Sequence, residues 1–557
     1  MWPANHLADE EKRRSSFHKR PFFRLLVLAL ASSFLCSCDQ GSLDSSETKQ
    51  ILRRGNGSEL QSLDPHVITG VPESRVVRAL FEGLVALDPV TLEPIPAAAR
   101  EWVVSADGTQ YEFFLAPDRK WSNGDPVVAD DFKDSIQRIL TVELGAGYAS
   151  QLFVLLNAKE YFEGEISDFD LVGVEAPDEH TLKITLKAPT PFFLSLLVNP
   201  AWFPVHRKSI ETFGEWTSRN AEWAKPGNLV SNGPYRLAKW KLNDYLSVDR
   251  NPFYPVEENF PLDEIVFFPI PNIFTEERAF LDDLIDITSI VSPQRIQYYL
   301  ESDSPEVLSV EPDLGVYYLL LNTLEPPLND PRVREALSLT IDRTAISRDI
   351  RRRGERPARH FTPVGIGAYE SPSVIEEDVI HAKALLAEAG YGPDNPLPPI
   401  EFLFNTSETH RPIAEAIQSF WKERLGITIT LVNKEWKTYL ADRTNRDFKI
   451  ARAGWLGDYL DPDTFLGLWT TESTNNFSGW SNPEFDRLMA EAGKLPSGKK
   501  RYQLLADAEE ILLEELPLIP IFFYNRAYLI SPRVKNWPSN ILGYTNYSGI
   551  SMEGPQK

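Results

Sequence analysis

Segments with the period of a β-strand and segments with the period of a helix alternate along most of this 557-residue chain. Residues 109–115, 181–187 and 234–240 alternate apolar and polar side chains, as half-buried strands do. Residues 413–425 have helical spacing, and Gly426 is placed to end that helix. Further helices are predicted at 333–350, 375–389, 483–491 and 502–515. The part of the chain that follows residue 37 has about 520 residues, which is more than usually fold around one hydrophobic core. We therefore predict an α/β protein with more than one lobe.

The N-terminus has the features of an export signal. A basic segment from Lys12 to Arg24 immediately precedes the apolar run 25–35, which at eleven residues is too short for a bilayer that needs about 20. Residues 35–38 (LCSC) resemble a bacterial lipobox with Cys38 as the lipid acceptor. We therefore predict a lipoprotein signal peptide at 1–37, lipidation at Cys38 and a Ser-rich tether at 38–49. The alternative, a thiol pair or metal site at Cys36 and Cys38, has no nearby His to complete a zinc site.

The charge balance narrows the classes of partner. The formal net charge is −23, and it is about −26 once the net +3 of residues 1–37 is removed. Such an acidic surface argues against nucleic acid and against broad adhesion to anionic lipid. We expect an extracytoplasmic protein that is held at the membrane by its lipid alone.

Residues 451–459 (ARAGWLGDY) place a cation and an anion on one glycine-containing segment, at Arg452 and Asp458. This arrangement suits a zwitterionic ligand with a carboxylate at one end and an ammonium at the other, as in a free peptide. The alternative is a surface ion pair, which contributes only about 0–1 kcal/mol.

Motifs for catalysis or cofactor binding are weak. The chain has no H-E-x-x-H, and residues 493–500 imitate a P-loop but end in Lys500 where Ser or Thr is required. Asp458, Asp461 and Asp463 miss the spacing of a calcium-binding EF-hand loop. We expect no enzymatic activity, no metal and no cofactor. A Ser/His/Asp arrangement that forms only in the folded protein is the alternative.

An ordered series of short motifs resembles the oligopeptide-binding lipoproteins of bacterial peptide ABC importers, in solute-binding protein family 5, which also contains dipeptide and nickel binders. The resemblance covers residues 50–530 in collinear order. Its motifs lie at 61–66 (QSLDPH), 70–74 (GVPES), 80–84 (LFEGL), 121–126 (WSNGDP), 129–132 (ADDF), 230–235 (VSNGPY), 249–252 (DRNP), 329–336 (NDPRVREA), 383–390 (KALLAEAG), 405–407 (NTS), 435–438 (EWKT) and 452–458.

The resemblance implies a two-lobed periplasmic-binding-protein fold with an extra subdomain and a hinge of two crossing strands. Mapped onto this chain, lobe one takes 50–82, 205–312 and 520–557, the extra subdomain 83–204, and lobe two 313–519. The crossings are expected at 315–321 and 518–523, and closure of the lobes around a ligand is the expected motion.

The resemblance also implies roles for individual residues. Asp458 matches the position that binds the ligand α-ammonium, and Arg452 and His410 match positions that meet the ligand carboxylate. Tyr148 matches a contact to the peptide backbone. The segments 69–71 and 453–456 would pair with an extended peptide as added strands. The full predicted set is Asp458, Arg452, His410, Tyr148, Trp455, Trp436, Arg443, Asn405, Gly70, Val71, Gly454 and Leu456.

Two positions depart from the family pattern, because Thr69 replaces a commonly acidic residue and Leu456 a smaller one. The expected function is a monomeric, lipid-anchored periplasmic receptor that passes short peptides to an ABC permease and its ATPase subunits. We expect its lipid to hold it at the inner membrane or, in an organism without an outer membrane, at the cell surface. Alternatives on the same fold are murein peptide, dipeptide, a nickel chelate or another small ligand. A peptide sensor and a peptidase are the alternatives from other classes.

Overall fold

The computed structural model describes residues 49–219, 222–255, 260–302, 307–372, 375–407, 409–473 and 475–554. The predicted signal peptide, Cys38 and nearly all of the tether lie outside the described residues. Within the described ranges, no helix is both long and apolar enough to cross a bilayer.

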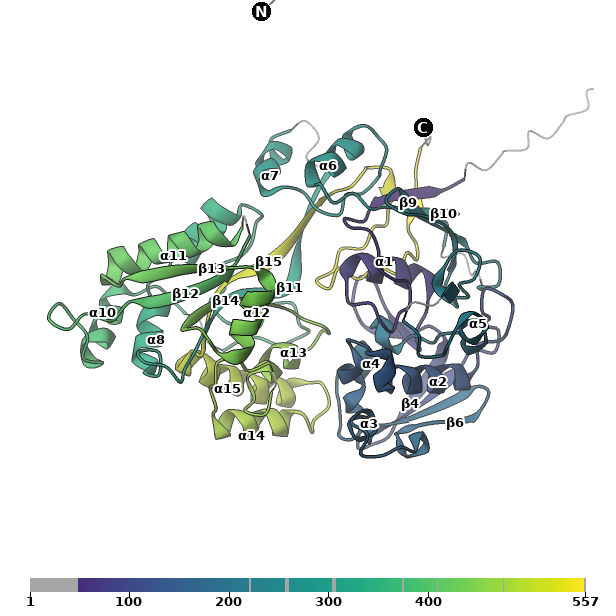
Figure 1. The fold of residues 1–557 in the computed structure, drawn as a ribbon, viewed down its shortest axis with the longest axis horizontal. Helices are drawn as coiled ribbons and strands as arrows, with labels where there is room; N and C mark the ends of the chain where they lie inside the picture. Colours follow the sequence, from purple (N-terminus) through teal and green to yellow (C-terminus); the bar gives the residue numbers. More distant parts are fainter. Residues whose placement is uncertain are drawn as a thin grey trace, which may run out of the picture. The chain divides into compact units, whose positions relative to one another are not determined.

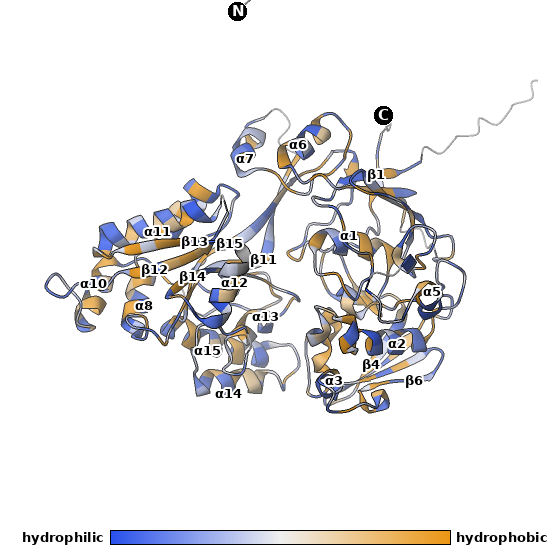
Figure 2. Ribbon diagram, viewed as in Figure 1, coloured by the Kyte–Doolittle hydropathy of each residue, from blue (hydrophilic) through white to orange (hydrophobic). Residues whose placement is uncertain are grey.

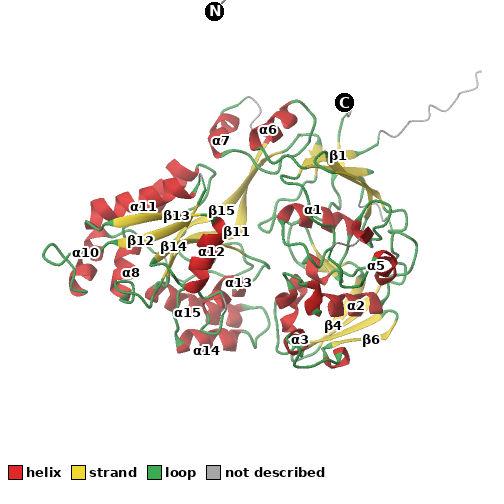
Figure 3. Cartoon of the chain, in the orientation of Figure 1, coloured by secondary structure: helices red, strands yellow, loops and turns green. Residues whose placement is uncertain are grey.

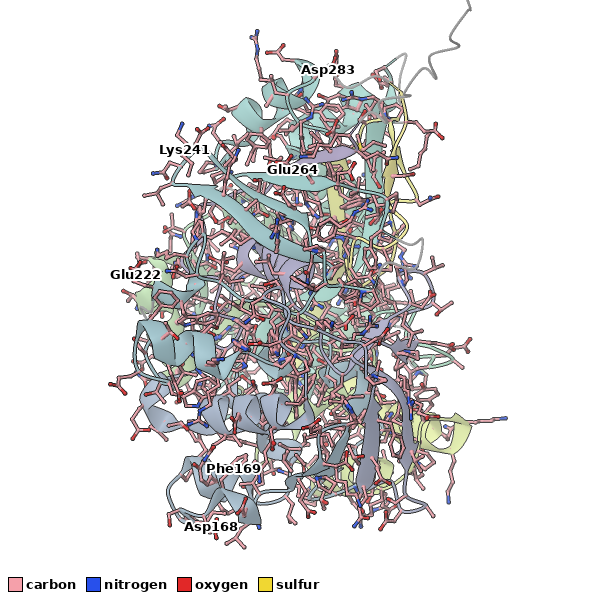
Figure 4. All side chains as sticks on the ribbon, turned by 90° about the vertical axis from the view of Figure 1, so that its right-hand side faces the viewer. Asp168, Phe169, Glu222, Lys241, Glu264 and Asp283 are labelled. Atoms are coloured by element: carbon pink, nitrogen blue, oxygen red, sulfur yellow. The ribbon has the colours of Figure 1, made fainter. Side chains whose placement is uncertain are left out.

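The first sheet joins strands that lie far apart in the sequence. β1 (Ile51–Gly55) runs parallel to β10 (Glu264–Phe268), which is antiparallel to β9 (Tyr245–Arg250), and β8 (Tyr235–Lys241) forms the other edge. Glu264, labelled in Figure 4, ties the start of the described chain to this sheet through Lys49, with 2.7 Å between Nζ and Oε2.

The second sheet is antiparallel and has the order β4 (Ala99–Val104), β5 (Gln110–Leu115), β7 (Thr181–Thr185) and β6 (Val174–Asp178). The predicted strands at 109–115 and 181–187 are confirmed. Helix α2 (Ala129–Leu140) packs on this sheet and begins where Asp131 accepts hydrogen bonds from the Val128 N–H (2.9 Å) and the Trp121 indole (3.0 Å). One continuous hydrophobic core joins the first two sheets.

The third sheet has five strands in the order β13 (Ile429–Lys434), β12 (Ile400–Asn405), β14 (Ile450–Leu456), β11 (Leu308–Leu321) and β15 (Leu518–Leu529). Alternate residues of β11 enter two separate cores, so both faces of the sheet are buried. Helices cover both faces (Figure 3), and much of the sheet is coloured as hydrophobic in Figure 2. The ends of β11 and β15 toward α6 (Ile273–Leu281) and α7 (Pro293–Leu300) are more hydrophilic. The third sheet and its helices form a second lobe, and its two cores are separate from the core that joins the first two sheets.

Helices around the third sheet fall into two groups. α8 (Pro331–Ser338), α10 (Val379–Glu388) and α11 (His410–Leu425) contribute to one core. α13 (Asp463–Leu466), α14 (Pro483–Ala492) and α15 (Lys499–Glu515) contribute to the other. The predicted single helix at 333–350 is wrong: the chain breaks after α8, and Asp342 starts α9 (Arg343–Ala345) by accepting a bond of 2.7 Å from the Ala345 N–H.

The two longest strands, β11 and β15, connect the lobes (Figure 1). Their pairing is interrupted between Pro312 and Val316, and it continues on both sides of the break. Beyond the break they pack with α6 (Ile273–Leu281) and α7 (Pro293–Leu300). The predicted crossings at 315–321 and 518–523 lie within these two strands.

The remaining helices and strands are short. They are α1 (Val71–Leu80), β2 (Val85–Leu87), β3 (Pro94–Pro96), α3 (Ala158–Phe162), α4 (Phe193–Leu196), α5 (Arg207–Phe213), α12 (Trp436–Asn445), β16 (Val534–Lys535) and β17 (Ser551–Met552). One aromatic stack connects the lobes, since the rings of Phe192 and Tyr459 lie 4.2 Å apart at an angle of 9°.

Candidate ligand-binding cleft

A cavity of about 310 Å³ lies between the two lobes. Its walls come from α1, from residues 311–314 of β11, from the turn after β14, from β15 and from residues 537–547. The cavity brings together three of the predicted residues, Val71, Leu456 and Asp458. Val71 and Leu456 are 61% and 55% exposed, so each offers an apolar side chain to whatever enters.

Asp458 is positioned by the turn that ends β14. The Gly457 N–H donates to the Leu314 carbonyl at 2.7 Å, and the Asp458 N–H donates to Thr464 Oγ1 at 3.2 Å. A Cβ on residue 457 would lie 2.7 Å from the Leu314 side chain, which explains the glycine there.

The Asp458 carboxylate makes no hydrogen bond or ion pair with any described residue. Its side chain is open to the cavity, yet the surrounding protein removes enough water for burial to raise its pKa to about 6. A carboxylate without a cation in such a place is a ready acceptor for an ammonium group.

Arg452 lies within β14, opposite Leu319 of β11. Its guanidinium lies over the Tyr317 ring, 5.2 Å from the centroid, and Nη2 donates to the Tyr524 hydroxyl at 3.4 Å. The backbone carbonyl of Arg452 accepts from the Tyr439 hydroxyl. No carboxylate of the described chain is in ion-pair range, and Nε is buried without a partner.

His410 begins α11 beside this arginine. Its ring centroid is 5.8 Å from that of Tyr317. Burial, and after it the charges of Arg452 and Arg351, lower the pKa of His410 to about 3. The imidazole is therefore neutral at physiological pH, and Nδ1 is buried without a partner among the described residues.

Three further predicted residues also carry buried polar atoms without a described partner. These atoms are Asn405 Oδ1 at the end of β12, Arg443 Nε on α12 and Trp455 Nε1 on β14. The Arg443 guanidinium lies 4.8 Å from the Phe477 ring centroid. Buried polar groups are almost always hydrogen-bonded in proteins, so this concentration marks a place where ligand or water completes the bonding.

Tyr148 and the segment 69–71 lie on the other lobe. Burial, and after it the nearby Asp458 carboxylate, raise the pKa of Tyr148, so its phenol lies near the cavity acid. Gly70 precedes α1, and its carbonyl accepts from the Ser74 N–H at 3.1 Å.

The last two predicted residues lie in the lobe of the third sheet. Gly454 pairs with Tyr317, and a Cβ there would lie 2.5 Å from the Tyr524 hydroxyl. Trp436 starts α12, but its side chain lies outside the described residues.

The structure thus forms two neighbourhoods: Asp458, Val71 and Leu456 line the cavity, and Arg452 and His410 meet around Tyr317. Sequence reasoning missed Tyr317, because an aromatic residue in a buried strand has the pattern of a core residue. It also missed the four arginines of the cavity wall, which carry no sequence signal: Arg54, Arg75, Arg78 and Arg526. No group of metal-binding side chains occurs in the described part of the chain.

The family model for bacterial extracellular solute-binding proteins, family 5 (middle), matches residues 93–477. The chain belongs to this family. The periplasmic oligopeptide-binding protein OppA of Escherichia coli K12 is 39% identical over 494 residues, which cover 87% of this chain and 89% of that protein.

Solved structures agree with this assignment. The unliganded open form of the periplasmic murein tripeptide-binding protein MppA has a TM-score of 0.79 and 38% identity, covering 90% of this chain and 97% of that one. A periplasmic oligopeptide-binding protein of an oligopeptide ABC transporter from Borrelia burgdorferi has a TM-score of 0.74 and 32% identity, covering 91% and 100%. The predicted family and two-lobed fold are confirmed.

Proposed function

We propose that this protein is an extracytoplasmic receptor that captures short peptides between its lobes and delivers them to an ABC permease. The observation that carries the proposal is the pair of charged groups on one segment, Arg452 and Asp458, neither of which has an ion-pair partner of opposite charge in the described structure. A free peptide carries the two complementary charges.

The roles of the site residues follow from their surroundings. Asp458 would bind the α-ammonium, and Arg452 or neutral His410 would bind the carboxylate. Asn405, Arg443 and Trp455 carry unpartnered polar atoms that suit a hydrated side-chain pocket. The functions of OppA and of the oligopeptide transporter component support peptides as the ligand class and an ABC permease as the partner.

The remaining parts of the proposal concern organisation and anchoring. The first sheet lies within the proposed lobe one (50–82, 205–312 and 520–557), and the second sheet lies within the extra subdomain (83–204). Most of the third sheet lies within lobe two (313–519). We place the protein in the periplasm as a monomer anchored through lipid on Cys38. It performs no chemistry, because ATP is hydrolysed by its partners.

A second candidate ligand is murein peptide, which the likeness to MppA favours. Mass spectrometry of the ligands released from the purified protein separates the two. A mixed population of short peptides supports the general receptor, and a single mass that matches a murein peptide supports the second candidate. A single non-peptide mass would contradict both.

A further inference from the structure

Four arginines line the cavity that contains Asp458, and three of them, Arg54, Arg75 and Arg78, have no carboxylate partner among the described residues. Arg54 lies on β1, and Arg75 and Arg78 lie three residues apart on α1, so the two α1 residues share one face of that helix. All three come from the lobe opposite Asp458. The part they take in ligand binding depends on the bonds that the protein itself makes to them.

Arg54 is nearly buried, with 7% of its surface exposed. Its Nη1 donates to the Tyr547 hydroxyl at 3.3 Å, and its guanidinium lies 5.0 Å from the Trp537 ring centroid. Its Nε is buried without a partner among the described residues. The cation is therefore held by a phenol and an aromatic ring, and no carboxylate of the described residues neutralises it.

Arg78 is fixed in a similar way. Its Nε donates to Ser74 Oγ at 3.3 Å and its Nη1 to the Val198 carbonyl at 2.7 Å, while the guanidinium lies 5.0 Å from the Tyr544 ring centroid. Burial lowers its pKa from the ordinary arginine value. These neutral partners orient the guanidinium and leave its charge uncompensated.

Arg75 makes the fewest bonds to the protein of the three arginines. Its side chain makes no hydrogen bond or ion pair with the described parts of the protein. Burial, and after it the neighbouring Arg54, lower its pKa to about 9. The charge of Glu276 acts on Arg75 in the opposite direction, but that carboxylate is outside ion-pair range and accepts instead from Ser289 Oγ at 2.8 Å.

The other acids on the cavity wall are already paired. Arg526 bonds to Glu311 at 3.2 Å and to Asp313 at 2.6 Å. Asp458 is on the opposite wall and has no partner of its own. The cavity therefore presents one free carboxylate on one side and three cations without a carboxylate on the other.

We propose that Arg54, Arg75 and Arg78 form a subsite for a carboxylate on the side chain of the ligand's first residue. The inference rests on the proposed function, in which Asp458 binds the α-ammonium of that residue. Because Asp458 and the arginines line one small cavity, the side-chain carboxylate belongs to the same residue as the ammonium. The guanidinium groups match a carboxylate in shape and charge. The receptor would thus prefer peptides that begin with Glu or Asp.

This preference runs against the charge of the whole protein. A net charge of −23 repels acidic peptides at long range. Selection of an acidic first residue therefore requires a local, solvent-shielded cluster of cations, and the cavity wall supplies one. The alternative is that lobe closure brings the arginines onto Asp458 itself, in which case an acidic ligand gains nothing.

Titration calorimetry with matched tripeptides tests the inference. Glu-Ala-Ala should bind roughly tenfold tighter than Gln-Ala-Ala, because charge-assisted bonds are about twice as strong as neutral ones. Ala-Glu-Ala and Ala-Gln-Ala should differ by less than about threefold. Equal affinity of the first pair overturns the subsite, and a larger preference at the second position overturns its placement. If no tripeptide of either kind binds, the peptide-receptor proposal itself fails.

A variant assigns the preference to the cluster. In Arg75→Gln, the ratio of the affinities for Glu-Ala-Ala and Gln-Ala-Ala should fall at least threefold. The reason is that the guanidinium with the fewest bonds to the protein is lost. In the matched control Arg487→Gln, on the exposed face of α14, the ratio should be unchanged. An unchanged ratio in folded Arg75→Gln protein overturns the assignment to these arginines. If that variant does not fold, the comparison of Glu-Ala-Ala with Gln-Ala-Ala on the wild-type protein still decides the proposal.

Discussion

Lowering the pH from 7 to 5 should weaken peptide binding, and Asp458 should be the cause. In the empty protein, burial raises the pKa of this carboxylate to about 6. A bound ammonium favours the charged carboxylate and therefore lowers that pKa. Affinity is thus complete above the pKa of the empty protein and is lost as the pH falls through it.

The size of the effect follows from that pKa. A carboxyl group with a pKa of about 6 is about 91% ionised at pH 7 and about 9% ionised at pH 5. The dissociation constant should therefore rise about tenfold, or about 1.4 kcal/mol. His410 adds nothing in this range, because its pKa of about 3 keeps it neutral throughout. The peptide amine, with a pKa near 8, is protonated at both pH values.

Isothermal titration calorimetry of one neutral-side-chain tripeptide, repeated at half-unit steps from pH 5 to pH 7, measures this directly. Asp458→Asn is the control, because it removes the titrating group and keeps the shape. Burial and the charge of Asp461 raise the pKa of Asp463 to about 6 as well. In Asp458→Asn, any pH dependence that Asp463 causes remains and can be measured separately. The variant should bind weakly and nearly independently of pH.

Two results would refute the reasoning. One is an affinity in the wild type that changes by less than about twofold over this range. The other is a pH dependence that survives in Asp458→Asn, which would mean that another group, such as Asp463, controls binding.

Three further predictions concern recognition, stability and anchoring. Asp458→Ala should cost roughly 2–5 kcal/mol of peptide affinity, and N-acetylation of the peptide should have a comparable effect; calorimetric values near wild type would reject ammonium recognition. Arg501→Gln should lower the free energy of unfolding in urea by about 3–5 kcal/mol, because Asp461, bonded to it at 2.7 Å, is left buried and unpaired; Arg487→Gln should cost less than about 1 kcal/mol, and equal losses would contradict the argument. Cys38→Ser should remove the acyl mass seen by intact-protein mass spectrometry, and a normally acylated product would show that the lipidation site lies elsewhere.

Local patterns predicted the elements of the fold better than their pairing. The strands at 109–115 and 181–187 alternate clearly and are adjacent in the second sheet. The parallel pairing of β1 with β10 joins segments more than 200 residues apart, and no local pattern encodes it. The helix predicted at 333–350 was wrong because helical spacing continues across a break that Asp342 caps.

The residues of the candidate site were likewise predictable only where they lie close together in the sequence. Arg452 and Asp458 were predicted from their spacing in one segment, since both lie at or near β14. Tyr317 and Arg75 were not predicted, because they come from β11 and α1 and meet the site only after folding. The family resemblance supplied His410 and Tyr148, which no local pattern would have selected.

The stacked rings of Phe192 and Tyr459 also bear on how fast the receptor works. They join the lobes one residue away from Asp458, and such a stack contributes about 0.5–1.5 kcal/mol beyond the area it buries. That energy raises the population of empty molecules with their lobes together by roughly two- to tenfold relative to a protein without the stack. In such an empty molecule the lobes must separate before a peptide can enter. The contact that prolongs the residence of a bound peptide therefore also slows the capture of the next one.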